Sequence, residues 1–174
     1  LTETHDLYFG LKAGFNSYNV NTDGLVTYGI QQDPNLMNLN GRFNPNFGVG
    51  LYLKHKDYFI SLSVPKVLSP ADRKHMYLAG GYNFVLSKTT ILKPSVLLRY
   101  VDASPLSVDL TALLDFNNYF DIGAAYRVDE SVSGLAIFKV AKTMQIGYAY
   151  EASLNNSVRR LDNGTHEIML NFKI

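Results

Sequence analysis

The chain has 174 residues, a formal net charge of +1, and charged residues at only 18% of its length. One domain accounts for a chain of this size, and the near-neutral balance offers no basic surface, so we predict no nucleic-acid partner. The sequence contains no cysteine, which excludes disulfides and thiolate metal sites. It also contains no run of about 18 apolar residues, which excludes a transmembrane helix.

Alternation of apolar and polar residues fills the chain, and amphipathic segments of helical period are nearly absent. A period of two is typical of a β-strand that has one apolar and one polar face. We predict ten strands, at residues 6–18, 45–54, 58–64, 74–86, 90–101, 106–116, 120–128, 131–140, 144–151 and 165–174. Pro94 lies inside the fifth of these, where it cannot donate a hydrogen bond to a neighbouring strand.

Strand length, mid-strand charge and loop length favour an outer-membrane β-barrel over a soluble sandwich. Most of the predicted strands exceed the usual soluble length of about 5 or 6 residues and approach the about 9 to 11 residues that cross a bilayer. Ionisable side chains occur in the middle of strands, on the polar face, where a barrel has a wet lumen. The connections also alternate in length: short ones lie at 55–57, 87–89, 117–118 and 141–143, and long ones at 19–44, 66–73 and 152–164.

Short periplasmic turns and longer extracellular loops are typical of outer-membrane barrels. If the last strand ends on the periplasmic side, the four short connections above are periplasmic. The long connections are then extracellular, together with the shorter ones at 102–105 and 129–130. We therefore predict an all-β fold: an antiparallel transmembrane outer-membrane β-barrel with ten strands, forming a single domain over residues 1–174 and contacting lipid. Aromatic residues suited to interfacial girdles fall on its outward faces, at Tyr100, Phe116, Tyr126, Tyr148, Tyr150 and Phe172.

The charged residues of the polar faces are the candidate functional residues. In a barrel they line the lumen, and we predict this position for Lys12, Lys93, Arg99, Asp109, Asp115, Asp121, Arg127 and Glu151. Four of them have two interpretations. Lys93, Arg99, Asp109 and Arg127 either form a selectivity ring or pair across the lumen as structural salt bridges, and we favour the second.

No pattern in the sequence indicates catalysis. His166-Glu167 begins like the zinc motif H-E-x-x-H, but Leu170 stands where the second histidine is required. The four histidines show no ligand spacing, and neither G-x-S-x-G nor a P-loop occurs. An outer-membrane protease or acyltransferase would have only His5-Asp6 and Asp72 with Lys74-His75 as nearby groups at a rim. We predict no catalytic residue, no cofactor and no metal, and therefore no enzyme.

Seven blocks of the sequence, taken together and in order, resemble the PorP/SprF family of Bacteroidetes outer-membrane proteins. They lie at residues 9–16, 46–50, 62–65, 92–101, 105–109, 147–150 and 164–170, and they cover nearly the whole chain. The block at 92–101 includes Pro94, which the strand pattern alone does not explain. Family members are longer, with a signal peptide and further N-terminal strands. The resemblance therefore implies that this chain corresponds to the C-terminal part of such a protein.

The resemblance also implies a function. It indicates a non-enzymatic outer-membrane component that helps type IX secretion to export or anchor cargo, including gliding adhesins. The implied partners are the C-terminal domain of a secreted cargo protein and other type IX secretion components. Two alternatives stay open from the residues: a passive, porin-like channel for small solutes, and a soluble ten-stranded binding barrel.

Overall fold

The computed structural model describes residues 4–18, 42–67, 74–155 and 164–172, and in 16–18 and 42–44 it describes the backbone only. These residues form an all-β structure without a helix, which confirms the all-β, antiparallel part of the prediction. The described part of the chain accordingly contains no helix that is long and apolar enough to cross a membrane. The strands are β1 (His5–Tyr18), β2 (Arg42–His55), β3 (Tyr58–Val64), β4 (His75–Tyr82), β5 (Phe84–Val85), β6 (Thr90–Val101), β7 (Ser107–Phe116), β8 (Phe120–Arg127), β9 (Ser131–Ala141), β10 (Met144–Ser153) and β11 (Thr165–Phe172).

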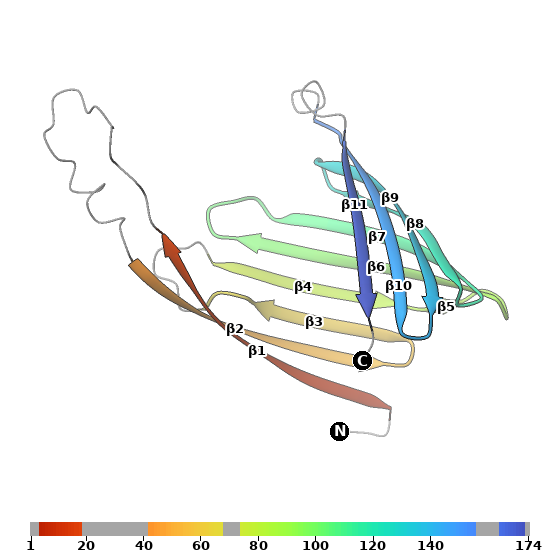
Figure 1. The fold of residues 1–174 in the computed structure, drawn as a ribbon, viewed down its shortest axis with the longest axis horizontal. Coiled ribbons are helices and arrows are strands. Elements are labelled where there is room, and N and C mark those ends of the chain that lie inside the picture. The colour runs from red at the N-terminus through yellow and green to blue at the C-terminus, as the bar shows by residue number, and fades with distance from the viewer. Residues whose placement is uncertain (1–3, 19–41, 68–73, 156–163, 173–174) are drawn as a thin grey trace, which may run out of the picture.

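The strands form one antiparallel sheet in which sequence neighbours are spatial neighbours. Its order is β1-β2-β3-β4-β6-β7-β8-β9-β10-β11, and β5 pairs with β6. Figure 1 shows that this sheet is strongly curved, with β1 at one edge and β11 at the other. These two edges do not pair with each other in the described residues, so the sheet is open there and the barrel stays a prediction.

The strand predicted over residues 74–86 is divided into β4 and β5 at Asn83. The register on the two sides of the break is the same, because Gly81 pairs with Ser95 and Phe84 pairs with Leu92. Pro94 lies in β6 opposite the break. Since proline has no N–H to donate, it interrupts the ladder without a shift of register. The proline explains the one difference in strand number between prediction and structure.

The connections lie alternately at the two ends of the sheet, as a meander requires. At one end, which we call the turn side, are residues 56–57, 86–89, 117–119 and 142–143. At the other end, which we call the loop side, lie the connections at 102–106 and 128–130 and the strand ends at Tyr18 and Arg42, Val64 and His75, and Ser153 and Thr165. The four connections predicted to be periplasmic are therefore gathered at one end, and the short connection at 128–130 lies at the other, as predicted.

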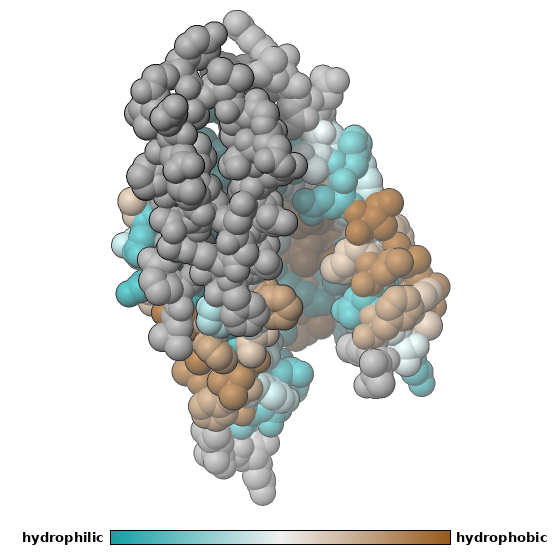
Figure 2. Space-filling model, turned by 60° about the vertical axis from the view of Figure 1, so that its left-hand side comes forward, coloured by the Kyte–Doolittle hydropathy of each residue, from teal (hydrophilic) through white to brown (hydrophobic). Residues whose placement is uncertain are grey.

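The register divides the side chains between a concave and a convex face. Even-numbered residues of β1 and β2 share a face with odd-numbered residues of all later strands. This face is concave, because a cavity on it is lined by side chains of strands from β6 to β11. Figure 2 shows the resulting hollow between the two arms of the sheet.

Burial is reversed relative to a soluble protein. No hydrophobic residue of the described chain is buried, whereas Asn46, Ser107, Asp115, Asp121 and Ser131 are. All five lie on the concave face. Large apolar residues of the convex face stand exposed along the whole sheet, from Phe9 (75%) to Ile168 (78%). Figure 2 shows brown, hydrophobic residues on both arms of the sheet, with teal residues above and below them.

Aromatic rings contact one another on the convex face near both ends of the sheet. On the turn side, the ring centroids of Phe116 and Phe120 are 4.9 Å apart, and those of Phe120 and Phe138 are 6.3 Å apart. On the loop side, Tyr150 and His166 have centroids 4.9 Å apart. Aromatic rings at two levels are typical of the girdles that flank the apolar band of an outer-membrane barrel.

Candidate functional site

The eight charged residues predicted to line a lumen all fall on the concave face. The register places Lys12 on β1, Lys93 and Arg99 on β6, Asp109 and Asp115 on β7, Asp121 and Arg127 on β8, and Glu151 on β10. Seven of them belong to two clusters, one at each end of strands β6 to β10. Their role as lumen residues stays a prediction, because the described sheet is not closed.

The first cluster lies beside the connection at 117–119, and we call it the turn-side cluster. Asp115 and Asp121 are direct cross-strand partners, and their side chains are only 5% and 8% exposed. Lys93 Nζ lies 2.5 Å from Asp115 Oδ2 and 3.5 Å from Asp121 Oδ2. Lys139 Nζ lies 2.7 Å from Asp115 Oδ2 and 3.1 Å from Asp121 Oδ1.

The turn-side cluster has no net charge, since two lysines face two aspartates. Two carboxylates directly opposite each other repel, and each lysine reduces this repulsion by contacting both. The cluster also binds the turn between β7 and β8. The Asn118 backbone N–H donates to Asp115 Oδ1 at 2.9 Å, and Lys139 Nζ donates to Asn118 Oδ1 at 2.9 Å. The cluster therefore connects strands β6 to β9 at this end and fixes the turn between β7 and β8.

The second cluster lies near the connection at 128–130, and we call it the loop-side cluster. Arg127 Nε donates to Asp109 Oδ1 at 2.6 Å. The guanidinium of Arg127 also lies 3.7 Å from Glu130 Oε2 and 3.8 Å from Glu151 Oε1. Arg99 lies 3.9 Å from Glu130 Oε2 and donates to Ser107 Oγ at 3.2 Å. Three carboxylates thus share two guanidinium groups, which leaves this cluster with an excess of one negative charge.

The ion pairs follow the wall of the sheet. They connect neighbouring strands, as Arg127 of β8 does with Asp109 of β7, or next neighbours, as Lys139 of β9 does with Asp115 of β7. Lys93, Arg99, Asp109 and Arg127 thus form salt bridges, but these run along the sheet. Pairing across a lumen stays a prediction, because the described sheet is not closed. Lys12 is apart from both clusters and forms no ion pair with any residue that the structure describes.

Sequence reasoning missed two members of these clusters, Lys139 and Glu130. Lys139 lies in the strand whose two faces are both largely apolar, so the alternation of that strand gave no orientation. In the strands before it, the charged face carries odd-numbered residues, from Asp109 to Arg127. The same numbering continues after the turn at 128–130, so it would have placed Lys139 on the charged face. Glu130 belongs to the connection itself, where a strand pattern predicts nothing.

A cavity of about 260 Å³ opens on the concave face next to the loop-side cluster. Asp109, Arg127, Ser131, Glu151 and Glu167 are among the residues that line it. A second cavity of about 290 Å³ at the loop side shares Arg127, Ser131 and Glu151 with it and adds Asp129 and Glu130. These lining groups can bind a polar or cationic group.

His166 and Glu167, which begin like a zinc motif in the sequence, do not point to a common site. His166 lies on the convex face, where its Nδ1 is 2.7 Å from the Tyr148 hydroxyl, whereas Glu167 lines the cavity on the opposite face. Adjacent residues of a strand point to opposite faces, so His166-Glu167 cannot serve one metal ion. Among the described residues, no three His, Cys, Asp or Glu side chains are placed to hold a metal.

The comparisons with known proteins identify a family. Neither the curated proteins nor the solved structures give a significant match to this chain. Residues 1–172 match the family described as type IX secretion system membrane protein PorP/SprF. This match confirms the resemblance seen in the sequence, and a family of secretion-system membrane proteins agrees with the predicted outer-membrane location. The chain therefore belongs to the PorP/SprF family of type IX secretion system membrane proteins.

Proposed function

We propose that this chain forms a membrane-spanning β-barrel of the bacterial outer membrane and serves type IX secretion by binding secreted cargo, without catalysing a reaction. The observation that carries the proposal is the reversed burial of its side chains. The convex face is apolar and exposed, and the concave face holds the buried polar and charged groups. Family membership supports a place in type IX secretion.

Lipid is the solvent that suits the convex face. Soluble monomers rarely expose contiguous apolar patches of more than a few hundred Å², and such patches are binding or membrane surfaces. Here the exposed apolar residues extend over the sheet from β1 to β11, with no buried hydrophobic core behind them in the described chain. Strands β1 and β2 have 14 residues each and β6 has 12, which is long enough for tilted strands to cross a bilayer.

Membrane insertion requires that the edges of the sheet be paired. Lipid offers the backbone no hydrogen-bond partner, so membrane sheets close into barrels. We therefore propose that β1 and β11 are both paired in the membrane and that the described strands form one continuous wall of a single barrel domain. In this orientation the turn side faces the periplasm and the loop side faces the exterior.

Cargo binding is the proposed role of the concave face and the loop side. Both ion-pair clusters hold their side chains in fixed positions along the wall, and the cavities beside the loop-side cluster offer a polar surface. We propose that the partner is the C-terminal domain of a secreted protein, presented together with other type IX components. A passive channel is the alternative function for the same wall.

Co-purification and conductance together separate these two functions. The experiment uses the detergent-solubilised protein as bait for the C-terminal domain of a type IX substrate, and the same preparation in planar bilayers. We expect the cargo domain to be retained and no wide, stable conductance to appear. A wide, stable conductance with no retention of the cargo domain would instead establish the passive channel and refute the secretion role.

A further inference from the structure

The two cavities beside the loop-side cluster carry more acidic than basic side chains. Asp109, Glu151 and Glu167 line the first cavity, with Arg127 as its one lining cation. The second cavity adds Asp129 and Glu130 and shares the same arginine. The lining residues of both therefore comprise five carboxylates and one guanidinium, and we call this combined site the acidic cavity.

Arg127 is already engaged and cannot neutralise the remaining carboxylates. Its Nε is 2.6 Å from Asp109 Oδ1, and Glu130 and Glu151 lie at 3.7 Å and 3.8 Å from its guanidinium. Glu167, which enters the first cavity from β11, has no ion pair with any described residue. Glu167 therefore brings to the cavity a negative charge that no described cation balances.

A second observation points to a missing ligand. Ser131 is only 4% exposed, lines both parts of the acidic cavity, and has a hydroxyl with no hydrogen-bond partner among the described residues. Buried polar groups in folded proteins are nearly always paired, because burial without a partner is unfavourable. A hydroxyl can both donate and accept, so it can receive an N–H from a bound group.

The geometry favours an organic cation over a metal ion. A calcium or magnesium ion needs several oxygens within about 2.0 to 2.6 Å of one point. No three acidic or histidine side chains of the described chain converge in this way. The carboxylates instead surround a space of about 260 Å³, which is large enough for the end of a basic side chain. Guanidinium and ammonium groups offer several N–H donors at once, which suits carboxylates and a hydroxyl on different sides of a cavity.

We propose that the acidic cavity binds the guanidinium or ammonium group of a cationic ligand, with Glu167, Glu151 and the Ser131 hydroxyl as its acceptors. The ligand is a basic side chain of a bound polypeptide or a small free amine. The first source deepens the proposed cargo-binding function and rests on it, and the second corresponds to passage of a solute. Both sources share the same recognition chemistry.

Calorimetric titration of the folded protein in detergent micelles tests the site. The probes are an arginine tripeptide, Gly-Arg-Gly with blocked ends, its citrulline counterpart, which has the same shape without the charge, and methylguanidinium. We expect the arginine peptide to bind about tenfold more tightly than the citrulline peptide, because a charge-assisted hydrogen bond is lost. Tighter binding of the arginine peptide than of methylguanidinium assigns the site to a polypeptide, and equal binding assigns it to a small amine.

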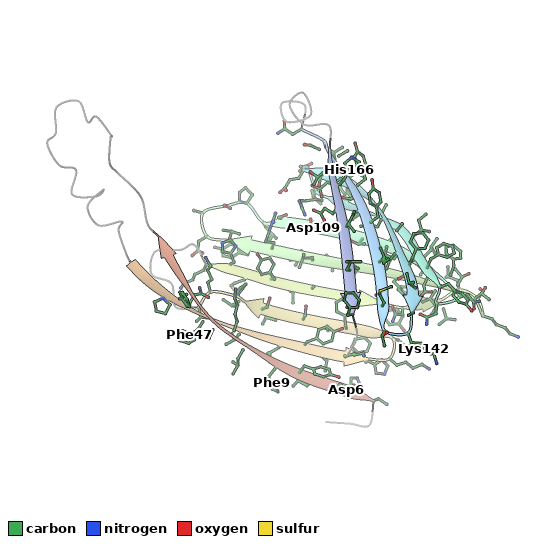
Figure 3. All side chains as sticks on the ribbon, in the orientation of Figure 1. Asp6, Phe9, Phe47, Asp109, Lys142 and His166 are labelled. Carbon is green, nitrogen blue, oxygen red and sulfur yellow. The ribbon has the colours of Figure 1, made fainter. Side chains whose placement is uncertain are left out.

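Glu167→Gln and Ser131→Ala are the test variants, and Asp6→Asn is the matched control. Asp6 is an exposed carboxylate on the concave face of β1, in a different part of the sheet from Asp109 (Figure 3). We expect Glu167→Gln to weaken the arginine peptide about tenfold and Asp6→Asn to leave it unchanged. Glu151→Gln provides a second acidic variant from another strand.

Two results would overturn the cation site. One is equal affinity for the arginine and citrulline peptides, and the other is an equal loss in Glu167→Gln and Asp6→Asn, which would indicate diffuse charge attraction. Heat-modifiable gel migration of the same samples reports the barrel separately. If the protein migrates as a folded barrel but does not bind the arginine peptide, the cation site alone is refuted. A protein without that migration refutes the barrel.

Discussion

Lys139 has the largest predicted effect on stability, because it contacts three partners at the turn side. Its Nζ lies 2.7 Å from Asp115 Oδ2, 3.1 Å from Asp121 Oδ1 and 2.9 Å from Asn118 Oδ1, and the side chain is 13% exposed. Lys139→Met leaves two facing carboxylates with Lys93 as their only cation. Removal of one partner from a buried ion pair costs about 3–5 kcal/mol, and because Lys93 still neutralises half of the charge we expect about 2–3 kcal/mol.

Urea unfolding of the protein in lipid vesicles, followed by far-UV circular dichroism, measures this loss. Lys142→Met is the matched control, because Lys142 is an exposed lysine of the next turn along the chain (Figure 3). We expect its unfolding free energy to stay within about 0.5 kcal/mol of the parent. The double variant Asp121→Asn with Lys139→Met restores neutrality and should recover part of the loss. The reasoning is refuted if Lys139→Met behaves like the control, or if the double variant shows the simple sum of the two single losses.

Three further substitutions test the close packing of the strands and the second cluster. In Gly123→Ala the new methyl overlaps the Ala112 backbone and approaches Leu113 Cα to 2.9 Å. We therefore expect the unfolding free energy in the same assay to fall by about 1–3 kcal/mol. Gly134→Ala is the control and should show no loss, because its new methyl meets nothing within 4 Å. Gly164→Ala should also destabilise, by about 1 kcal/mol or more, since φ is +98° there. Arg127→Met should destabilise at low salt and be partly rescued at 1 M salt, since screening over about 3 Å reduces the repulsion among the remaining carboxylates; an effect that does not depend on salt would contradict this account.

The strands could be predicted from the sequence because a period of two marks both their existence and their faces. The strands at 58–64 and 90–101 have the predicted bounds, and most others differ by one to three residues. The start of β2 at Arg42 was missed, although Phe43 continues the odd-numbered apolar row of Phe47 and Val49. The strand extends to Arg42 because it pairs there with β1, where Arg42 lies opposite Tyr18. The interruption at Asn83 depends on the strand opposite, which the local pattern does not contain.

The charges could be assigned to a face from the sequence, but their partners could not. Alternation places Asp115 and Asp121 on one face, whereas their direct opposition depends on the register of β7 with β8. The contact of Lys139 with Asp115 spans an intervening strand and needs the curvature of the sheet as well. Closure of the sheet into a barrel cannot be predicted from the alternation for the same reason. The alternation indicates the face to which a side chain points, but it does not indicate which strands lie at the edges of the sheet.

The central claim is that the convex face contacts lipid and the concave face does not. Since the chain has no cysteine, single substitutions can carry a spin label in an otherwise natural sequence. In vesicles, we expect labels at Leu110→Cys and Ala124→Cys, on the convex face, to collide with lipid-dissolved oxygen and to be shielded from a polar nickel chelate. Labels at Thr111→Cys and Ala125→Cys, on the concave face, should show less oxygen collision. Convex positions that are more accessible to the nickel chelate than to oxygen would contradict a membrane-spanning barrel.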